Sequence, residues 1–175
     1  MSAKAVKPAL GLDLWGTLFM ERTAEGERIK TEDAVPIEGA ISATRELVNL
    51  FGPKQVYIIS AKKNPNSHHL SLRRLQEWRL PEQTFFMQTG LLRENVRFCD
   101  SDAEKIALCQ FYGITHFVDN KPQVHDALAG FVPFKILYCP SAEYLAAYPK
   151  VIQQVRLVRS WEEAVTYIKH SVRRQ

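Results

Sequence analysis

The chain has 175 residues, of which 46% are hydrophobic and 24% charged, and its formal net charge is +4. This length and balance predict one domain, residues 1–175, with a sizeable core. No apolar run approaches the roughly 20 residues that span a bilayer, so we expect no membrane segment. Because the first residues form no long apolar segment and the cysteines form no CxxC pair, we expect a cytoplasmic protein without a disulfide framework. The modest positive charge favours anionic partners, and a solvated basic surface explains it better than a dedicated nucleic-acid face.

Strands and helices alternate along the chain, which predicts an α/β fold with a central parallel sheet. We expect strands at residues 9–14, 55–60, 84–87, 115–118, 134–138 and 155–158. We expect helices that begin at Pro36, near His68, at the Ser101/Glu104 capping box, at Pro122 and at Trp161. Residues 19–34 are polar, with a hairpin turn predicted at Glu25-Gly26, and residues 88–100 give no clear pattern.

Polar side chains end three of the predicted strands, namely Asp13, Ser60 and Asp119. Ligands collect beyond the carboxyl ends of the strands in a parallel α/β sheet, so we expect these residues at one edge. Lys105 lies in the first turn of the helix before the fourth strand, where it is either a site residue or an exposed helix lysine. A basic set follows the second strand, and its loop members Lys62 and Lys63 are expected near the same edge, where they could steer an anion. Such clusters are usually solvated faces.

The run from Leu10 to Leu18, LGLDLWGTL, resembles the first motif of the haloacid dehalogenase (HAD) superfamily, a hydrophobic strand followed by Asp-x-Asp-Gly-Thr. The order strand-Asp, strand-Ser, Lys, strand-Asp matches the four HAD motifs across roughly residues 9–130. The resemblance implies a HAD-like Rossmannoid three-layer domain. The chain departs from the pattern at Trp15, where HAD phosphatases carry a second Asp, and at Asn120, which replaces the second acid of the fourth motif.

The resemblance also implies roles for the individual residues. Asp13 is the expected nucleophile and forms an aspartyl-phosphate, while Lys105 offsets the charge shared by nucleophile and phosphate. Asp13 and Asp119 are the expected ligands of Mg²⁺, an ion that prefers oxygen ligands, with the Trp15 backbone carbonyl as a third. The substrate phosphate is expected to contact four residues, namely Thr17, Ser60, Trp15 and Asn120. Asn120 is equally well explained as a turn residue.

Trp15 leaves the mechanism open, because an indole cannot transfer a proton to the leaving group, a contribution worth ~10²–10⁴ in rate. His68, His69 and Glu21 are possible substitutes, although each is explained better as a surface residue. A Mg²⁺-dependent phosphatase is the leading hypothesis, and a catalytically impaired phosphate-binding protein of HAD fold is the main alternative. Metal-free, dehalogenase-like hydrolysis is a third, against which Asp119 counts. Trp15 is then either a packing residue at the strand end or a platform beside the substrate.

The spacing of the motifs bears on the substrate. Residues 18–35, between Thr17 and the helix expected at Pro36, leave room for a small flap but not for a cap domain, and residues 88–100 are also too few. An uncapped site suits a large phosphorylated substrate, such as a phosphoprotein, a nucleic-acid end or a glycan, or a partner that completes the pocket. Small substrates are also compatible, because oligomerisation can close an open site.

Overall fold

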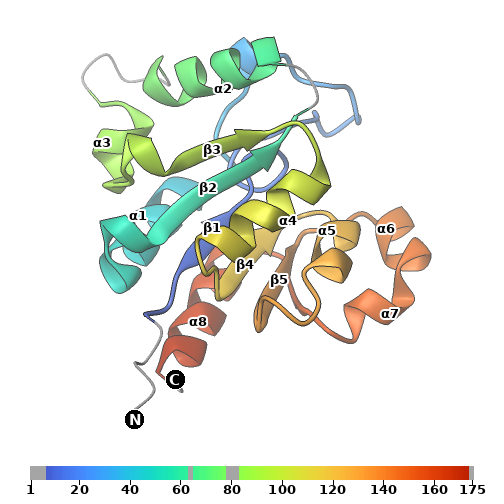
Figure 1. Ribbon diagram of the computed structural model, residues 1–175. Coiled ribbons are helices and arrows are strands. Elements are labelled where there is room, and N and C mark those ends of the chain that lie inside the picture. Colours follow the sequence, from blue (N-terminus) through green and yellow to red (C-terminus); the bar gives the residue numbers. More distant parts are fainter. Residues whose placement is uncertain (1–6, 63–64, 78–82, 174–175) are drawn as a thin grey trace.

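The computed structural model describes residues 7–62, 65–77 and 83–173. A six-stranded parallel sheet in the order β3-β2-β1-β4-β5-β6 forms the central layer (Figure 1). Its strands are β1 (Leu10–Leu12), β2 (Val56–Ala61), β3 (Val96–Cys99), β4 (His116–Asp119), β5 (Phe134–Tyr138) and β6 (Arg156–Val158). The expected α/β fold with helices on both sides of a parallel sheet is confirmed.

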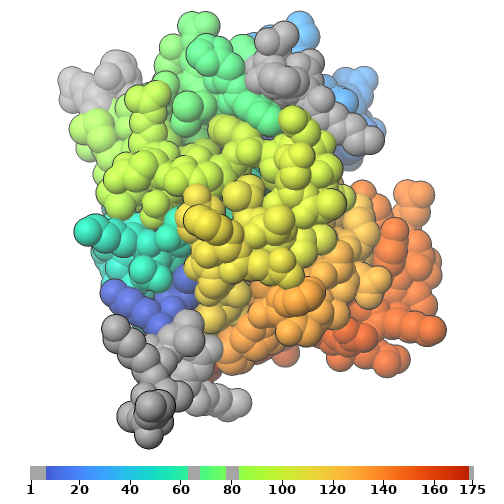
Figure 2. Space-filling model, viewed as in Figure 1, coloured from blue at the N-terminus to red at the C-terminus, as the bar shows by residue number. Residues whose placement is uncertain are grey.

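Helices cover both faces of this sheet. The helices of the described residues are α1 (Ala40–Phe51), α2 (Pro65–Glu77), α3 (Phe85–Thr89), α4 (Asp102–Phe111), α5 (Pro122–Ala127), α6 (Ala142–Ala147), α7 (Pro149–Ile152) and α8 (Trp161–Val172). Helices α1 and α8 pack on one face, and α4 and α5 cover the other, where their side chains form the yellow-to-orange surface of Figure 2. Short 3₁₀ turns lie at Thr31–Asp33, Pro53–Gln55 and Arg93–Asn95.

The two-residue period of the strands divides the core into two apolar clusters. Leu10 and Leu12 of β1 join the cluster under α1 and α8, whereas Phe117 of β4 joins the cluster under α4 and α5. Gly11 points toward that second cluster, where an added Cβ would lie 2.4 Å from the Phe117 ring. The small residue therefore lets the two central strands carry a large aromatic between sheet and helix.

Several predicted elements agree with the structure. The fifth strand and the last helix have the expected bounds. At the start of α4, the Ser101 hydroxyl accepts from the Glu104 amide at 3.2 Å, and the Glu104 carboxylate accepts from the Asp100 amide at 2.9 Å. The hairpin at Glu25-Gly26 is also confirmed, because its flanking residues Arg22 and Arg28 form an antiparallel bridge. Within the described residues, none of the helices combines the length and apolar character needed to cross a membrane.

The strand expected at 84–87 is wrong, and residues 85–89 form the helix α3. The Thr84 hydroxyl accepts from the Met87 amide at 3.3 Å and caps this helix, which buries Phe85 and leaves Met87 exposed. So short an apolar run carries no usable periodicity, which explains the error. The third strand is instead β3, inside the stretch 88–100 that gave no pattern. The helix expected at Pro36 begins later, at Ala40.

Candidate active site

Three buried charged residues meet at the carboxyl edge of the sheet. Asp13 follows β1, and its amide donates to the Val118 carbonyl at 2.9 Å, which brings it beside Asp119 at the end of β4. Lys105 reaches this point from the first turn of α4, the helix that packs over β2 and β3 (Figure 1). Its Nζ lies 2.7 Å from Asp13 Oδ1 and 2.7 Å from Asp119 Oδ2. The alternative of an exposed helix lysine is therefore wrong, because Lys105 is 0% exposed.

The charges of this cluster do not balance. Burial raises the pKa of Asp13; the Lys105 ammonium opposes this shift, and the Asp119 carboxylate adds to it. Burial alone would lower the pKa of Lys105, but attraction to Asp119 and Asp13 raises it well above its ordinary value. Lys105 thus stays charged, and one ammonium bridges two carboxylates. With both carboxylates ionised, the cluster would favour a further cation at this point.

The second oxygen of each carboxylate is placed differently. Asp13 Oδ2 has the Thr17 hydroxyl 3.5 Å away, at the limit of a hydrogen bond. Asp119 Oδ1 accepts from the Lys121 amide at 2.8 Å. Carboxylate oxygens such as those of Asp13 and Asp119 are the hard donors that Mg²⁺ takes, and one or two carboxylates suffice for that ion. The donor set therefore fits magnesium.

The turn after Asp13 brings Asn120 against the backbone. Gly16 has a φ of +77°, and a Cβ there would lie 2.2 Å from the Asn120 amide nitrogen, so the two loops touch only because Gly16 has no side chain. Asn120 Oδ1 is buried and accepts no hydrogen bond from the described residues. A buried, unpartnered acceptor beside the cluster is what a ligand or an ordered water satisfies.

The other residues predicted for the site lie around it. Thr17 is fully buried, and its carbonyl accepts from the Trp161 indole at 3.1 Å, which fixes the turn to α8. Ser60 is buried near the end of β2, the strand next to β1, and so shares the carboxyl edge with Asp13. The substrate contacts expected for Thr17, Ser60, Asn120 and Trp15 stay predictions.

Trp15 is almost fully buried, with 5% of its surface exposed. Its indole nitrogen donates to the Ser71 hydroxyl of α2 at 3.2 Å, and its ring tilts against Phe19 with the centroids 6.1 Å apart. The Lys62 ammonium lies over the ring, 4.2 Å from the centroid. Burial lowers the pKa of Lys62, and the charge of Glu21 opposes that shift. Trp15 therefore packs in the core while one ring face carries a cation.

Of the predicted substitutes for the missing acid, His68 has other contacts. His68 Nε2 donates to the Lys62 carbonyl at 2.7 Å, and the ring stacks on Phe98. His69 is exposed on α2.

Sequence reasoning missed His125, whose Nε2 donates to the Asp119 carbonyl at 3.0 Å. Burial lowers the pKa of His125 to about 4, so the neutral ring holds the backbone of Asp119. The short spacing between Asp119 at the end of β4 and His125 in the following helix α5 was the available signal.

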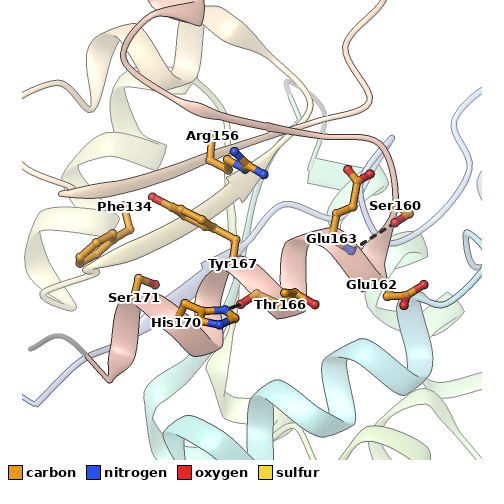
Figure 3. Close-up of a pocket in the computed structure, with 9 residues that line it drawn as sticks. All are labelled: Phe134, Arg156, Ser160, Glu162, Glu163, Thr166, Tyr167, His170 and Ser171. Atoms are coloured by element: carbon orange, nitrogen blue, oxygen red, sulfur yellow. Dashed lines mark hydrogen bonds between the residues drawn. The ribbon is translucent and has the colours of Figure 1, made fainter.

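A separate open pocket lies between α8 and the starts of β5 and β6 (Figure 3). Its volume is about 650 Å³, and its lining includes Phe134, Arg156, Glu163, Tyr167 and His170. None of the residues predicted for the site lines it. The charged cluster is thus distinct from this hollow in the surface.

Comparisons with known proteins support the fold. Neither the family models nor the curated proteins include a match to this sequence. Among solved structures, the chain is similar to the D,D-heptose 1,7-bisphosphate phosphatase of B. bronchiseptica in complex with magnesium and phosphate, with a TM-score of 0.67, 9% identity, and coverage of 94% of this chain and 99% of that chain. It is also similar to the Burkholderia thailandensis enzyme of the same name, with a TM-score of 0.59, 14% identity, and coverage of 93% and 98%. The chain therefore shares its three-layer fold with these two phosphatases.

Proposed function

We propose that the chain is a HAD-like phosphatase that forms an aspartyl-phosphate on Asp13. The observation that carries this proposal is the buried bridge of Lys105 between Asp13 and Asp119 at the carboxyl edge of the sheet. A charge cluster of this kind is costly to bury, and its position is where ligands bind in such folds. The likeness in fold to two sugar-phosphate phosphatases supports the same reading.

We infer different tasks for the two oxygens of Asp13. Lys105 holds Oδ1 at 2.7 Å, and among the described residues Oδ2 has only the long Thr17 contact. Oδ2 attacks phosphorus, the bond from phosphorus to the leaving oxygen breaks, and an aspartyl-phosphate results. Lys105 stays charged beside the reacting group and stabilises the negative charge that gathers there. Water then cleaves the aspartyl-phosphate and regenerates the Asp13 carboxylate.

Magnesium is the cofactor that we propose for this site. Asp13 and Asp119 would hold it, with the Trp15 backbone carbonyl as the third protein ligand that the HAD resemblance implies. Among the described residues, no group of three or more His, Cys, Asp and Glu side chains could hold a metal ion, whereas Mg²⁺ usually takes one or two carboxylates and keeps several waters. When bound, Mg²⁺ supplies positive charge for the phosphate oxygens. The magnesium and phosphate of the B. bronchiseptica complex support this choice.

We propose a phosphorylated compound as the substrate. A phosphorylated macromolecule could also reach the site, because the segment over it is short. Residues between β1 and α1 form only a small hairpin and one 3₁₀ turn. Arg74 of α2 donates to the Ala34 carbonyl at 2.8 Å and holds this flap down. We do not propose the sugar bisphosphate of the structural neighbours as the substrate of this chain, because the likeness to them is one of fold alone.

One observation favours a second candidate, a phosphate-binding protein of the same fold with impaired turnover. Trp15 offers no transferable proton at the position of the family's general acid, and its indole N–H is already bonded to Ser71. Turnover would then be lost while the phosphate pocket remains.

The two candidates separate in one assay. With Mg²⁺ and p-nitrophenyl phosphate, the phosphatase should release p-nitrophenol, and Asp13→Asn should lower the rate by at least about 10³-fold, because the nucleophile is lost. Asp126→Asn, an exposed carboxylate on α5, is the matched control and should leave the rate unchanged. Phosphate binding without turnover in the wild type would favour the binding protein instead.

A further inference from the structure

The Lys62 ammonium lies on the face of the Trp15 ring, and the backbone of Lys62 is held by hydrogen bonds. Lys62 directly follows β2, and its amide donates to the Cys99 carbonyl at 2.8 Å. Its carbonyl accepts from His68 Nε2 at 2.7 Å, so both of its backbone polar groups are bonded. Its Nζ lies 4.2 Å from the centroid of the Trp15 ring. A long lysine side chain is usually mobile, but this one has a fixed base and an aromatic platform.

Helix α2 holds both the Trp15 ring and the backbone of Lys62. Ser71 accepts from the indole nitrogen of Trp15, and His68, one turn earlier on α2, donates to Lys62. The only N–H of the indole therefore points into the core, and the ring presents its π face to Lys62. The residue two positions after the nucleophile thus supports a positive charge.

A positive charge at this point acts on an anion. Lys62 lies over the ring of Trp15, two residues after Asp13, and its ammonium interacts electrostatically with the Asp13 carboxylate. The Glu21 carboxylate also interacts with Lys62, while Arg28 and Lys121 add positive charge to the same surroundings. A leaving oxygen that departs from phosphorus opposite Asp13 carries negative charge, and an ammonium stabilises it without transferring a proton.

Resting on the proposed phosphatase function, we propose that the Trp15–Lys62 pair selects substrates whose leaving group departs as a stable anion. Acyl phosphates and phosphoanhydrides are the chemical classes that meet this condition. Simple alkyl phosphates do not, because an alkoxide leaves slowly unless an acid protonates it. Lys62 is then a specificity-determining residue that pairs with the departing oxygen.

The reaction balances without a general acid. An oxygen of Asp13 forms a bond to phosphorus, and the bond from phosphorus to the leaving oxygen breaks with its electron pair on that oxygen. The carboxylate or phosphate so released departs unprotonated and pairs with the Lys62 ammonium. Water then attacks phosphorus and the Asp13–phosphorus bond breaks, with one water proton retained on inorganic phosphate and one released to solvent.

The test is a leaving-group series on the wild-type protein with Mg²⁺. The probes are acetyl phosphate, aryl phosphates from dinitrophenyl to unsubstituted phenyl, and glycerol 3-phosphate. We expect kcat/KM to fall steeply as the pKa of the leaving group rises, and glycerol 3-phosphate to react at least about 10²-fold more slowly than acetyl phosphate. A rate that does not depend on the leaving group would overturn the inference.

Two variants sharpen the result. Lys62→Met should lower kcat/KM for acetyl phosphate roughly tenfold, a modest effect because solvent screens a half-buried ammonium. Lys54→Met is the matched control, since Lys54 is exposed just before the start of the same strand. An unchanged rate in Lys62→Met would contradict the role of the cation. Trp15→Asp should flatten the leaving-group dependence, and the wild-type series decides the question even if that buried substitution fails to fold.

Failure of the inference differs visibly from failure of the proposed function. Equal turnover of alkyl and acyl phosphates that Asp13→Asn abolishes removes only the selection by leaving group. No turnover of any member of the series removes the proposed function, and this inference with it.

Discussion

The two ends of strand β4 each bury a titratable residue, but only Asp119, at the end of the strand, shares its charged partner with a second carboxylate. At the start of the strand, His116 is 0% exposed and both ring nitrogens have partners, the Thr115 hydroxyl at 2.8 Å and the Ser171 hydroxyl at 3.0 Å. Its ring also stacks on Phe134, 4.5 Å between centroids. Every polar atom is used within the fold, and no charge is left over.

At the other end of β4, the buried carboxylates outnumber the buried ammonium. Asp119 and Asp13 share a single ammonium, and the nearby Asn120 Oδ1 has no partner among the described residues. A protein that buries charge without balancing it loses stability unless something else binds. The contrast shows that an unbalanced buried group points to a ligand, whereas buried polarity alone does not.

The largest expected effect comes from removing the bridge. Lys105→Met leaves two buried carboxylates facing each other, so we expect the free energy of unfolding to fall by about 3–5 kcal/mol. Urea unfolding in the presence of a chelator measures it, with Lys54→Met as the exposed control. A loss close to that of the control would mean that the cluster is solvated, and the contrast with His116 would disappear.

A smaller loss of stability is expected when the pH is lowered, because of His116 at the start of β4. Burial lowers the pKa of His116 from an ordinary 6.5 to about 4. Below pH 6.5 the unfolded chain therefore takes up a proton on His116, whereas the folded protein does not. The free energy of unfolding is highest above that pH and decreases as the pH falls toward 4. For His116 the loss between pH 7 and pH 5 is about 2 kcal/mol.

His125 carries the same shift, so a variant must separate the two histidines. In His116→Gln, the change in unfolding midpoint between pH 7 and pH 5 should shrink markedly, whereas the exposed His170→Gln is the control. An undiminished change would show that His116 is not held neutral by the fold.

The sequence predicted those features that depend on local pattern or chain order. Helix α4 begins at the predicted capping box, where the Ser101 hydroxyl accepts from the Glu104 amide at 3.2 Å, and residue types alone are enough to predict such a cap. The meeting of Asp13 with Asp119 followed from the parallel sheet, because both residues end adjacent strands. The helix at Phe85 was misjudged because two adjacent aromatics fit either a strand or a helix.

The remaining features depend on contacts between distant residues. Nothing local to Trp15 indicates that Ser71 binds its indole or that Lys62 lies over its ring. Lys105 could be assigned to a helix, but its burial depends on how α4 packs over the sheet. These contacts decide what the site can do, which is why the fold could be predicted further than the chemistry.

The most direct measurement of the central claim is to look for the phosphorylated aspartate. After brief incubation with acetyl phosphate and Mg²⁺ and an acid quench, peptide mass spectrometry should find one hydroxylamine-sensitive phosphoryl group on Asp13. Asp13→Asn should lack it, and Asp126→Asn should retain it. A phosphoryl group on another residue, or substrate turnover that never labels Asp13, would contradict the account.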